Sequence, residues 1–471
     1  MSRAAGRSGL PGRWTVAAGA GLAVVAWILM GATAAAQELD RARLAAAVDS
    51  IVEEALKGGR AAGMSVAVVR GADTIVMKGY GYAELEHKVP TPDRAVYEIG
   101  SLTKQFTAAA VLKLEAEGKL SLDDDITKYF PDYPTRGHRI PLRRLLDHTS
   151  GIKSYTEMPA FGQLSVMKLP RDTLVKLVSA EPFDFAPGDA LVYNNSAYFL
   201  LGLVIEKVSG RGYDSYVREH LFEPAGMTDS RYCHERAVVE RRAHGYDMTG
   251  FGLMRAAYLD HTWPYAAGSL CSTVGDLVAW TRALHGGRIL PDAAHRSMIT
   301  PEPLNSGVRP RYAKGLVVDS IAGRPAISHG GAIHGFQSEL AYFPEDTLVI
   351  AVLMNTAGPV SPAAVLRSIA EAIYGEAPPV KAAPFTGNAD DYVGEYRGVG
   401  RGRELVVQIG KGEDGGLTAR IGGGRPVPLT YLGNETFDTS RRRITFIREN
   451  GRVTGAWVDL ISVVSPLERR E

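Results

Sequence analysis

The sequence predicts an α/β domain with a helical insertion, followed by a small antiparallel β domain. Strand-like segments lie near both ends of the first 375 residues, and helix-like segments fill the middle. The chain has 471 residues, more than one hydrophobic core usually supports, so a second domain is expected. A nucleotide-binding doubly wound sheet is disfavoured, because strands and helices do not alternate regularly and no glycine fingerprint follows an early strand.

Residues 1–36 are predicted to be a signal peptide and are excluded from the fold. Three arginines precede an apolar run from about residue 14 to 32, and three alanines follow at 34–36. The apolar run approaches the length of a membrane span, so an uncleaved N-terminal anchor is the alternative. The protein is therefore expected to be exported, into the periplasm or outside the cell.

The elements of the first domain, residues 37–376, follow from apolar spacing and from capping residues. A helix within 38–59 leads into strands at 64–71 and 73–84, which a short turn joins. Helices are then expected after Ser101 and within 141–152, 195–210 and 272–287, and strands return at 314–323, 324–331, 338–344 and 347–355 before a helix at 362–375.

The pattern changes after residue 376. Residues 377–390 contain three prolines and have no apolar periodicity, which predicts a linker. Residues 391–471 contain short strand-like segments, and one hairpin has Asn450-Gly451 at its turn. A β domain of this size is marginal by itself, so it is expected to pack against the first domain.

The charge balance excludes two classes of partner. Lys and Arg number 53 against 52 Asp and Glu, which leaves no long-range field for nucleic acid or an anionic membrane. A small-molecule or peptide substrate is expected, and the oligomeric state is left open. No cofactor and no metal are predicted, because His334 follows His329 by five residues without a third ligand at a recognisable spacing.

Two cysteines, Cys233 and Cys271, lie in the exported part of the chain. Export permits a disulfide between them, which would stabilise the fold by about 4 kcal/mol in the chain-entropy model. Two free buried thiols are the alternative.

Ser101 and Lys104 form a Ser-x-x-Lys pair at the start of an apolar helix that ends near Gly118. One turn apart, they share a face of the helix. Lysine can take the proton of an attacking hydroxyl only if burial lowers its pKa, and a helix N-terminus favours the negative charge that develops. The alternative is that Ser101 only caps the helix. A second pair, Ser165 and Lys168, is followed by Pro170, which prevents the same arrangement.

Two further groups strengthen the catalytic hypothesis. Tyr193 and Asn195 stand just before a predicted helix, where they could face Ser101. His329 is followed by two glycines at the end of a predicted strand, and glycines allow the backbone to approach a ligand closely. His148 is interpreted as a structural residue near the site.

The segments "SLTK", "YNN" and "HGG" resemble, in order and separation, the three motifs of serine β-lactamases and penicillin-binding proteins. The segments "LDHTSGI" and "AAGSLCSTVGDLVAW" are similar to the branch that contains class C β-lactamases, DD-carboxypeptidases and serine esterases. The resemblance covers roughly residues 40–375. It implies a β-lactamase/transpeptidase-like fold, an antiparallel sheet flanked by helices with a helical region, and a lipocalin-like β-barrel after the linker.

The resemblance also implies roles for individual residues. Ser101 would be acylated, Lys104 and Tyr193 would share acid and base work, and Asn195 would hold the substrate amide or Lys104. His329 and Gly331 belong to the third motif, and the backbone N–H groups of Ser101 and Ala332 would form the oxyanion hole.

The implied function is an exported serine hydrolase that forms an acyl-enzyme at Ser101. Its substrate would be a D-amino-acid peptide, a β-lactam or a carboxyl ester. The third motif reads His-Gly-Gly where relatives have Lys-Thr-Gly, which removes a positive charge that helps to bind penicillins. The alternative is a non-catalytic scaffold of the same fold that binds cell-wall peptides or a protein partner.

Overall fold

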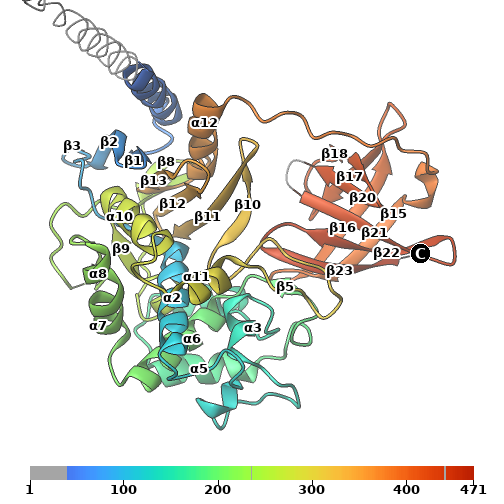
Figure 1. Cartoon of the computed structure of the whole chain (residues 1–471), viewed down its shortest axis with the longest axis horizontal. Helices are drawn as coiled ribbons and strands as arrows, with labels where there is room; N and C mark the ends of the chain where they lie inside the picture. Colours follow the sequence, from blue (N-terminus) through green and yellow to red (C-terminus); the bar gives the residue numbers. More distant parts are fainter. Residues whose placement is uncertain (1–39, 235, 440–441, 471) are drawn as a thin grey trace, which may run out of the picture.

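The structure is a computed structural model that describes residues 40–234, 236–439 and 442–470. The predicted signal peptide, residues 1–36, lies outside the described residues. Figure 1 shows an α/β part and a β part, which the segment after α12 (Pro362–Tyr374) connects. Among the described helices, none combines the length and the apolar character needed to cross a membrane.

The α/β part is built on an antiparallel sheet of seven strands in the order β10-β11-β12-β13-β1-β2-β3. Strand β1 pairs with β13 in a register that places Met64 opposite Met354, so segments from both ends of this part share one sheet, as predicted. The strands are β1 (Gly63–Arg70), β2 (Asp73–Glu84), β3 (Val89–Pro90), β10 (Val317–Ile321), β11 (Arg324–Ile333), β12 (Phe336–Phe343) and β13 (Leu348–Met354).

Helices cover both faces of this sheet, because successive side chains of a strand point to opposite faces. Val66 and Val68 of β1 join the apolar cluster formed with the helix at 40–56 and with α12. Ala67 and Val69 join a second cluster, which includes α2 (Thr103–Ala116) and α10 (Val274–His285). The core of the α/β part therefore has two layers of helix around one sheet.

Side-chain caps begin two long helices of the helical region. The side chain of Asn194 caps α6 (Asn195–Ser209) by accepting from the N–H of Ala197, and Gly210 ends it with a φ of 69°. Thr273 caps α10 in the same way. The other helices of the region are α3 (Leu142–Leu146), α4 (Phe161–Leu164), α5 (Arg171–Ala180), α7 (Tyr213–Val217), α8 (Glu223–Ala225), α9 (Tyr265–Gly268) and α11 (Asp292–Ile299).

Short strands connect the helical region to the start of α2. Cys233 and Cys271 form a disulfide with their Cα atoms 5.5 Å apart. Cys271 lies in β9, which pairs with the strand just before Ser101. The short strands are β4 (Tyr97–Glu98), β6 (Arg231–Tyr232), β9 (Leu270–Ser272), and the separate set β7 (Tyr246–Thr249), β8 (Gly252–Arg255) and β14 (Thr356–Ala357).

The C-terminal part is one antiparallel sheet that curves toward a barrel (Figure 1). Its hairpin turns at Asn450 and Gly451, both with positive φ, as the sequence predicts. The strands are β15 (Gly394–Val399), β16 (Glu404–Lys411), β17 (Leu417–Ile421), β18 (Val427–Pro428), β19 (Thr430–Gly433), β20 (Thr436–Thr439), β21 (Arg442–Glu449), β22 (Arg452–Asp459) and β23 (Val463–Arg470).

The two parts share a sheet edge and an ion-pair cluster. Strand β23 pairs with β5 (Leu191–Val192) of the helical region, and the N–H of Tyr193 donates to the carbonyl of Ser462 at 2.9 Å. Buried Arg311 donates to the carboxylate of Asp459 at 2.9 and 3.0 Å and to Asp319 at 2.9 Å. The β part is therefore fixed beside Tyr193.

Candidate active site

Ser101 lies in a short 3₁₀ turn, Gly100–Leu102, that leads into α2. Ser101 does not cap this helix, because its side chain makes no capping hydrogen bond and α2 begins two residues later, so the alternative of a serine that only caps is wrong. Gly100 has a φ of +52°, which favours glycine, and this turn directs the chain into the helix. The hydroxyl of Ser101 is half-buried and lines two cavities.

Lys104 is fully buried beneath Ser101. Its Nζ lies 3.1 Å from Oγ of Ser101, 2.8 Å from Oδ1 of Asn195 and 2.8 Å from the carbonyl oxygen of Ala267. The two carbonyl oxygens can only accept, so they take the two N–H bonds of a neutral amine. The position toward the hydroxyl of Ser101 is then taken by an N–H in the charged amine and by the lone pair in the neutral amine. Burial lowers the pKa of Lys104 well below its ordinary value, and the positive charge of Arg401 adds to this effect.

Tyr193 completes the buried group. The Nζ of Lys104 lies 4.7 Å from the centroid of the Tyr193 ring. Within the described part of the chain, the Tyr193 hydroxyl has no hydrogen-bond partner. Burial raises the pKa of Tyr193, and the nearby Ser101 partly opposes this shift. Its hydroxyl is therefore protonated at neutral pH and able to donate.

Asn195 is the first residue of α6 rather than a loop residue. Its Oδ1 accepts from Lys104, which is one of the two roles that the sequence left open, and its Nδ2 donates to Oγ1 of Thr156 at 3.2 Å. Thr156 lines both cavities at Ser101 but carries no motif that the sequence could have revealed. Ala267, whose carbonyl accepts from Lys104, was likewise not singled out, although it lies within the segment "AAGSLCSTVGDLVAW" that resembles the family.

His329 is buried and neutral. Its Nδ1 lies 2.6 Å from the carbonyl oxygen of Gly330, which only accepts, so Nδ1 carries the proton. Its Nε2 then accepts from the hydroxyl of Tyr312 at 2.9 Å. Burial lowers the pKa of His329 to about 3. His329 therefore does not supply the positive charge of the lysine found in relatives.

The two glycines after His329 allow a close approach, but the approach is to backbone rather than to a ligand. A Cβ at Gly331 would lie 2.1 Å from the carbonyl oxygen of Ile99. A Cβ at Gly100 would likewise lie 2.9 Å from the backbone nitrogen of Ala332. The N–H groups of Ser101 and Ala332 thus belong to neighbouring segments at one cavity.

Two cavities meet at Ser101. The first has about 140 Å³, and apolar side chains such as Tyr155, Phe161 and Leu259 contribute much of its wall. The second is a groove of about 510 Å³ along the edge of β11, which Tyr193 and His329 line together with Arg401 and Ser462 of the β part. We call these the apolar pocket and the polar groove.

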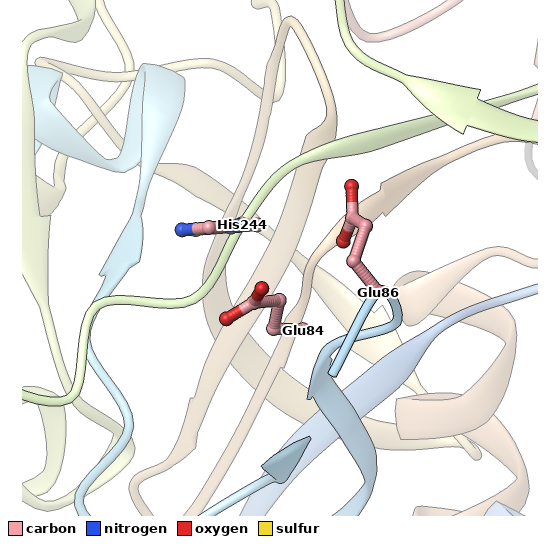
Figure 2. A group of neighbouring side chains, drawn as sticks. All are labelled: Glu84, Glu86 and His244. Carbon is pink, nitrogen blue, oxygen red and sulfur yellow. The ribbon is translucent and has the colours of Figure 1, made fainter. Parts of the chain in front are cut away.

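A separate group of side chains has the composition of a metal site, but an arginine already pairs with it. Figure 2 shows Glu84, Glu86 and His244, whose ligand atoms lie within 4.8 Å of one another. Arg255 donates to Glu86 at 2.5 Å and contacts Nδ1 of His244 at 3.1 Å, so its guanidinium supplies the positive charge there. Glu84 contacts His87 at 2.5 Å. We assign no metal to this group.

The family model described as Beta-lactamase matches residues 48–373. The chain belongs to this family. Protein flp of Staphylococcus aureus (strain MRSA252) is 27% identical over 318 residues, which cover 65% of the chain and 62% of that protein. The match thus spans less than two thirds of this relative.

Solved structures of the family confirm the predicted β-lactamase/transpeptidase-like fold. The D-stereospecific amidohydrolase from Streptomyces sp. is 29% identical, with a TM-score of 0.59 over 69% of this chain and 97% of that structure. The octameric penicillin-binding protein homologue from Pyrococcus abyssi is 26% identical, with a TM-score of 0.62 over 89% of this chain and 99% of that structure. The second match extends past the α/β part into the β part.

Proposed function

We propose that the protein is an exported serine hydrolase of the β-lactamase family that forms an acyl-enzyme at Ser101. The observation that carries this proposal is the environment of Lys104: its Nζ lies 3.1 Å from Oγ of Ser101, and burial lowers its pKa well below the ordinary value, which favours the neutral amine that a base requires. A binding scaffold would gain nothing from a buried lysine in this arrangement, because burying an amine is unfavourable without a partner charge.

In the proposed reaction, Oγ of Ser101 attacks the carbonyl carbon of an amide or ester, and its proton passes to the neutral amine of Lys104. The N–H groups of Ser101 and Ala332 hold the oxyanion. The bond to the leaving group breaks as that group takes a proton, relayed from Lys104 through Tyr193. Water then adds to the acyl carbon, its proton passes to Lys104 and on to Oγ, and the acid is released.

The proposed substrate is an amide or ester of a D-amino acid, which the D-stereospecific amidohydrolase among the relatives supports. His329 is neutral, so it does not supply the positive charge that the third motif of relatives offers to the carboxylate of penicillins. The apolar pocket is suited to the side chain of the acyl group.

The first test is the pre-steady-state release of p-nitrophenol from p-nitrophenyl acetate by residues 37–471. We expect a burst stoichiometric with enzyme, which Ser101→Ala abolishes. Ser165→Ala, in the second Ser-x-x-Lys segment, is the matched control and should keep the burst. If the wild type and Ser101→Ala were equally inert toward this ester and toward D-amino-acid amides, the non-catalytic scaffold would be the better hypothesis.

A further inference from the structure

We propose that Arg401, a residue of the β part, binds a carboxylate on the leaving group of the substrate, so that the enzyme prefers amides and esters whose leaving group is anionic. This inference rests on the proposed function and assigns its substrate class. It differs from simple amidase activity, in which the leaving group is ammonia.

Arg401 lies at the site although it comes from the far part of the chain. It stands in the loop between β15 and β16, and the centre of its guanidinium lies 5.3 Å from the centroid of the Tyr193 ring. Its Nη2 donates to Oε1 of Glu157 at 2.9 Å. Gly402, with a φ of +64°, lets the loop approach, because a Cβ there would lie 2.7 Å from Oε2 of Glu157. The position of the guanidinium is thus fixed by two contacts.

The polar groove receives the leaving group. The proton for the leaving group comes through Tyr193, and Tyr193 lines the polar groove but not the apolar pocket. The leaving group must therefore depart on the side where Arg401 stands, while the acyl side chain occupies the apolar pocket.

Among the described residues that line the groove, Arg401 is the one arginine or lysine. His329 is neutral, and the amine of Lys104 lies beneath Ser101 with its N–H bonds directed at carbonyl oxygens. A guanidinium has five N–H donors, and the hydrogen bond to Glu157 uses one of them. The others can hold a carboxylate, which is the anion that a guanidinium fits best.

The carboxylates near the groove set where the anion binds. Glu339 lines the groove from β12, opposite Gly330 in the strand register. An anion is therefore disfavoured at the β12 end and favoured at the end formed by the β part. Glu157 competes with the substrate for Arg401, so a bound carboxylate has to share or displace that contact.

The test uses two esters that differ only in charge on the leaving group, 4-acetoxybenzoate and methyl 4-acetoxybenzoate. The measured quantity is the ratio of kcat/KM for the anionic ester to kcat/KM for the neutral one. We expect Arg401→Gln to lower this ratio about 10- to 100-fold relative to wild type, the range of one charge-assisted contact. Arg403→Gln, in the same loop but lining a different cavity, should leave the ratio unchanged. Glu157→Gln should raise it, because it frees the guanidinium.

The ratio separates binding from indirect effects. Arg401 also acts on the titration of Lys104, but that effect changes the rates of both esters alike and cancels in the ratio. If Arg401→Gln kept the wild-type ratio while the burst persisted, the inference would be wrong and the proposed function would stand. If wild type released no burst from either ester, the proposed function itself would fail.

Discussion

The amine of Lys104 is fully buried, and burial together with the positive charge of Arg401 disfavours its charged form. Since the amine must be neutral to take the proton of Ser101, kcat/KM should fall as the pH drops through the lowered pKa of Lys104 and stay level above it. Lys104→Arg keeps the charge at every accessible pH and should lower kcat/KM by about 10²- to 10⁴-fold. The pH–rate profile of p-nitrophenyl acetate hydrolysis measures both effects.

Substitution of Arg401 tests whether the acidic limb of the pH–rate profile belongs to Lys104. Its positive charge lowers the pKa of Lys104, so Arg401→Gln should move the acidic limb of the profile to higher pH. Between the lowered pKa of Lys104 in the folded chain and its ordinary pKa in the unfolded chain, only the unfolded chain binds this proton. In that pH window the free energy of unfolding therefore rises with pH. An acidic limb that stays in place in Arg401→Gln would mean that another group titrates.

Some residues of the candidate site could be predicted from the sequence, and others could not. Ser101 and Lys104 are three residues apart at the start of an apolar helix, and Asn195 stands at the start of another, so local spacing was enough to single them out. Arg401 could not be found in this way, because nothing in its local sequence indicates a site 300 residues upstream. Its contact with Tyr193 depends on how the β part packs against the helical region.

At the scale of elements, the strand pair β5–β23 controls the position of Tyr193. Val464 of β23 is buried with Leu191 of β5 and with Tyr312, the partner of His329. Val464→Ala should lower the free energy of unfolding by about 1–3 kcal/mol and also lower kcat/KM several-fold, because Tyr193 directly follows β5. Chemical denaturation and ester hydrolysis measure the two effects.

Val458→Ala is the matched control, since Val458 is equally buried but lies in the core of the β part. It should cost similar stability and leave kcat/KM near the wild-type value. Equal activity of the two variants would show that the pairing of β5 with β23 does not position the site.

Long elements were predictable because each satisfies its own local requirements. The helices α6 and α10 begin at side-chain caps, and the alternation of β1 places Val66 and Ala67 on opposite faces. Strand β5 has only two residues and no local pattern. It exists because β23, far along the chain, offers it a hydrogen-bonded partner. The turn at Ser101 was missed for a related reason, since tertiary packing of Gly100 against Ala332 sets it.

At the scale of the whole molecule, the β part contributes to the candidate active site only while it is held against the α/β part. Arg311 makes this connection with hydrogen bonds to Asp459 of the β part and Asp319 of β10, and its side chain is 9% exposed. Arg311→Gln would leave the largely buried carboxylate of Asp459 without this cation, which should lower the free energy of unfolding by about 3–5 kcal/mol.

The same variant tests the link between packing and specificity. If Arg311 holds the β part in place, Arg311→Gln should reduce the preference for 4-acetoxybenzoate over its methyl ester toward the value of Arg401→Gln, and should speed proteolysis within residues 376–390. Arg324→Gln removes an exposed ion pair with Glu345 and should cost only about 0–1 kcal/mol without changing the preference. A destabilised Arg311→Gln that kept the wild-type preference would mean that the strand pair β5–β23 alone keeps Arg401 at the groove.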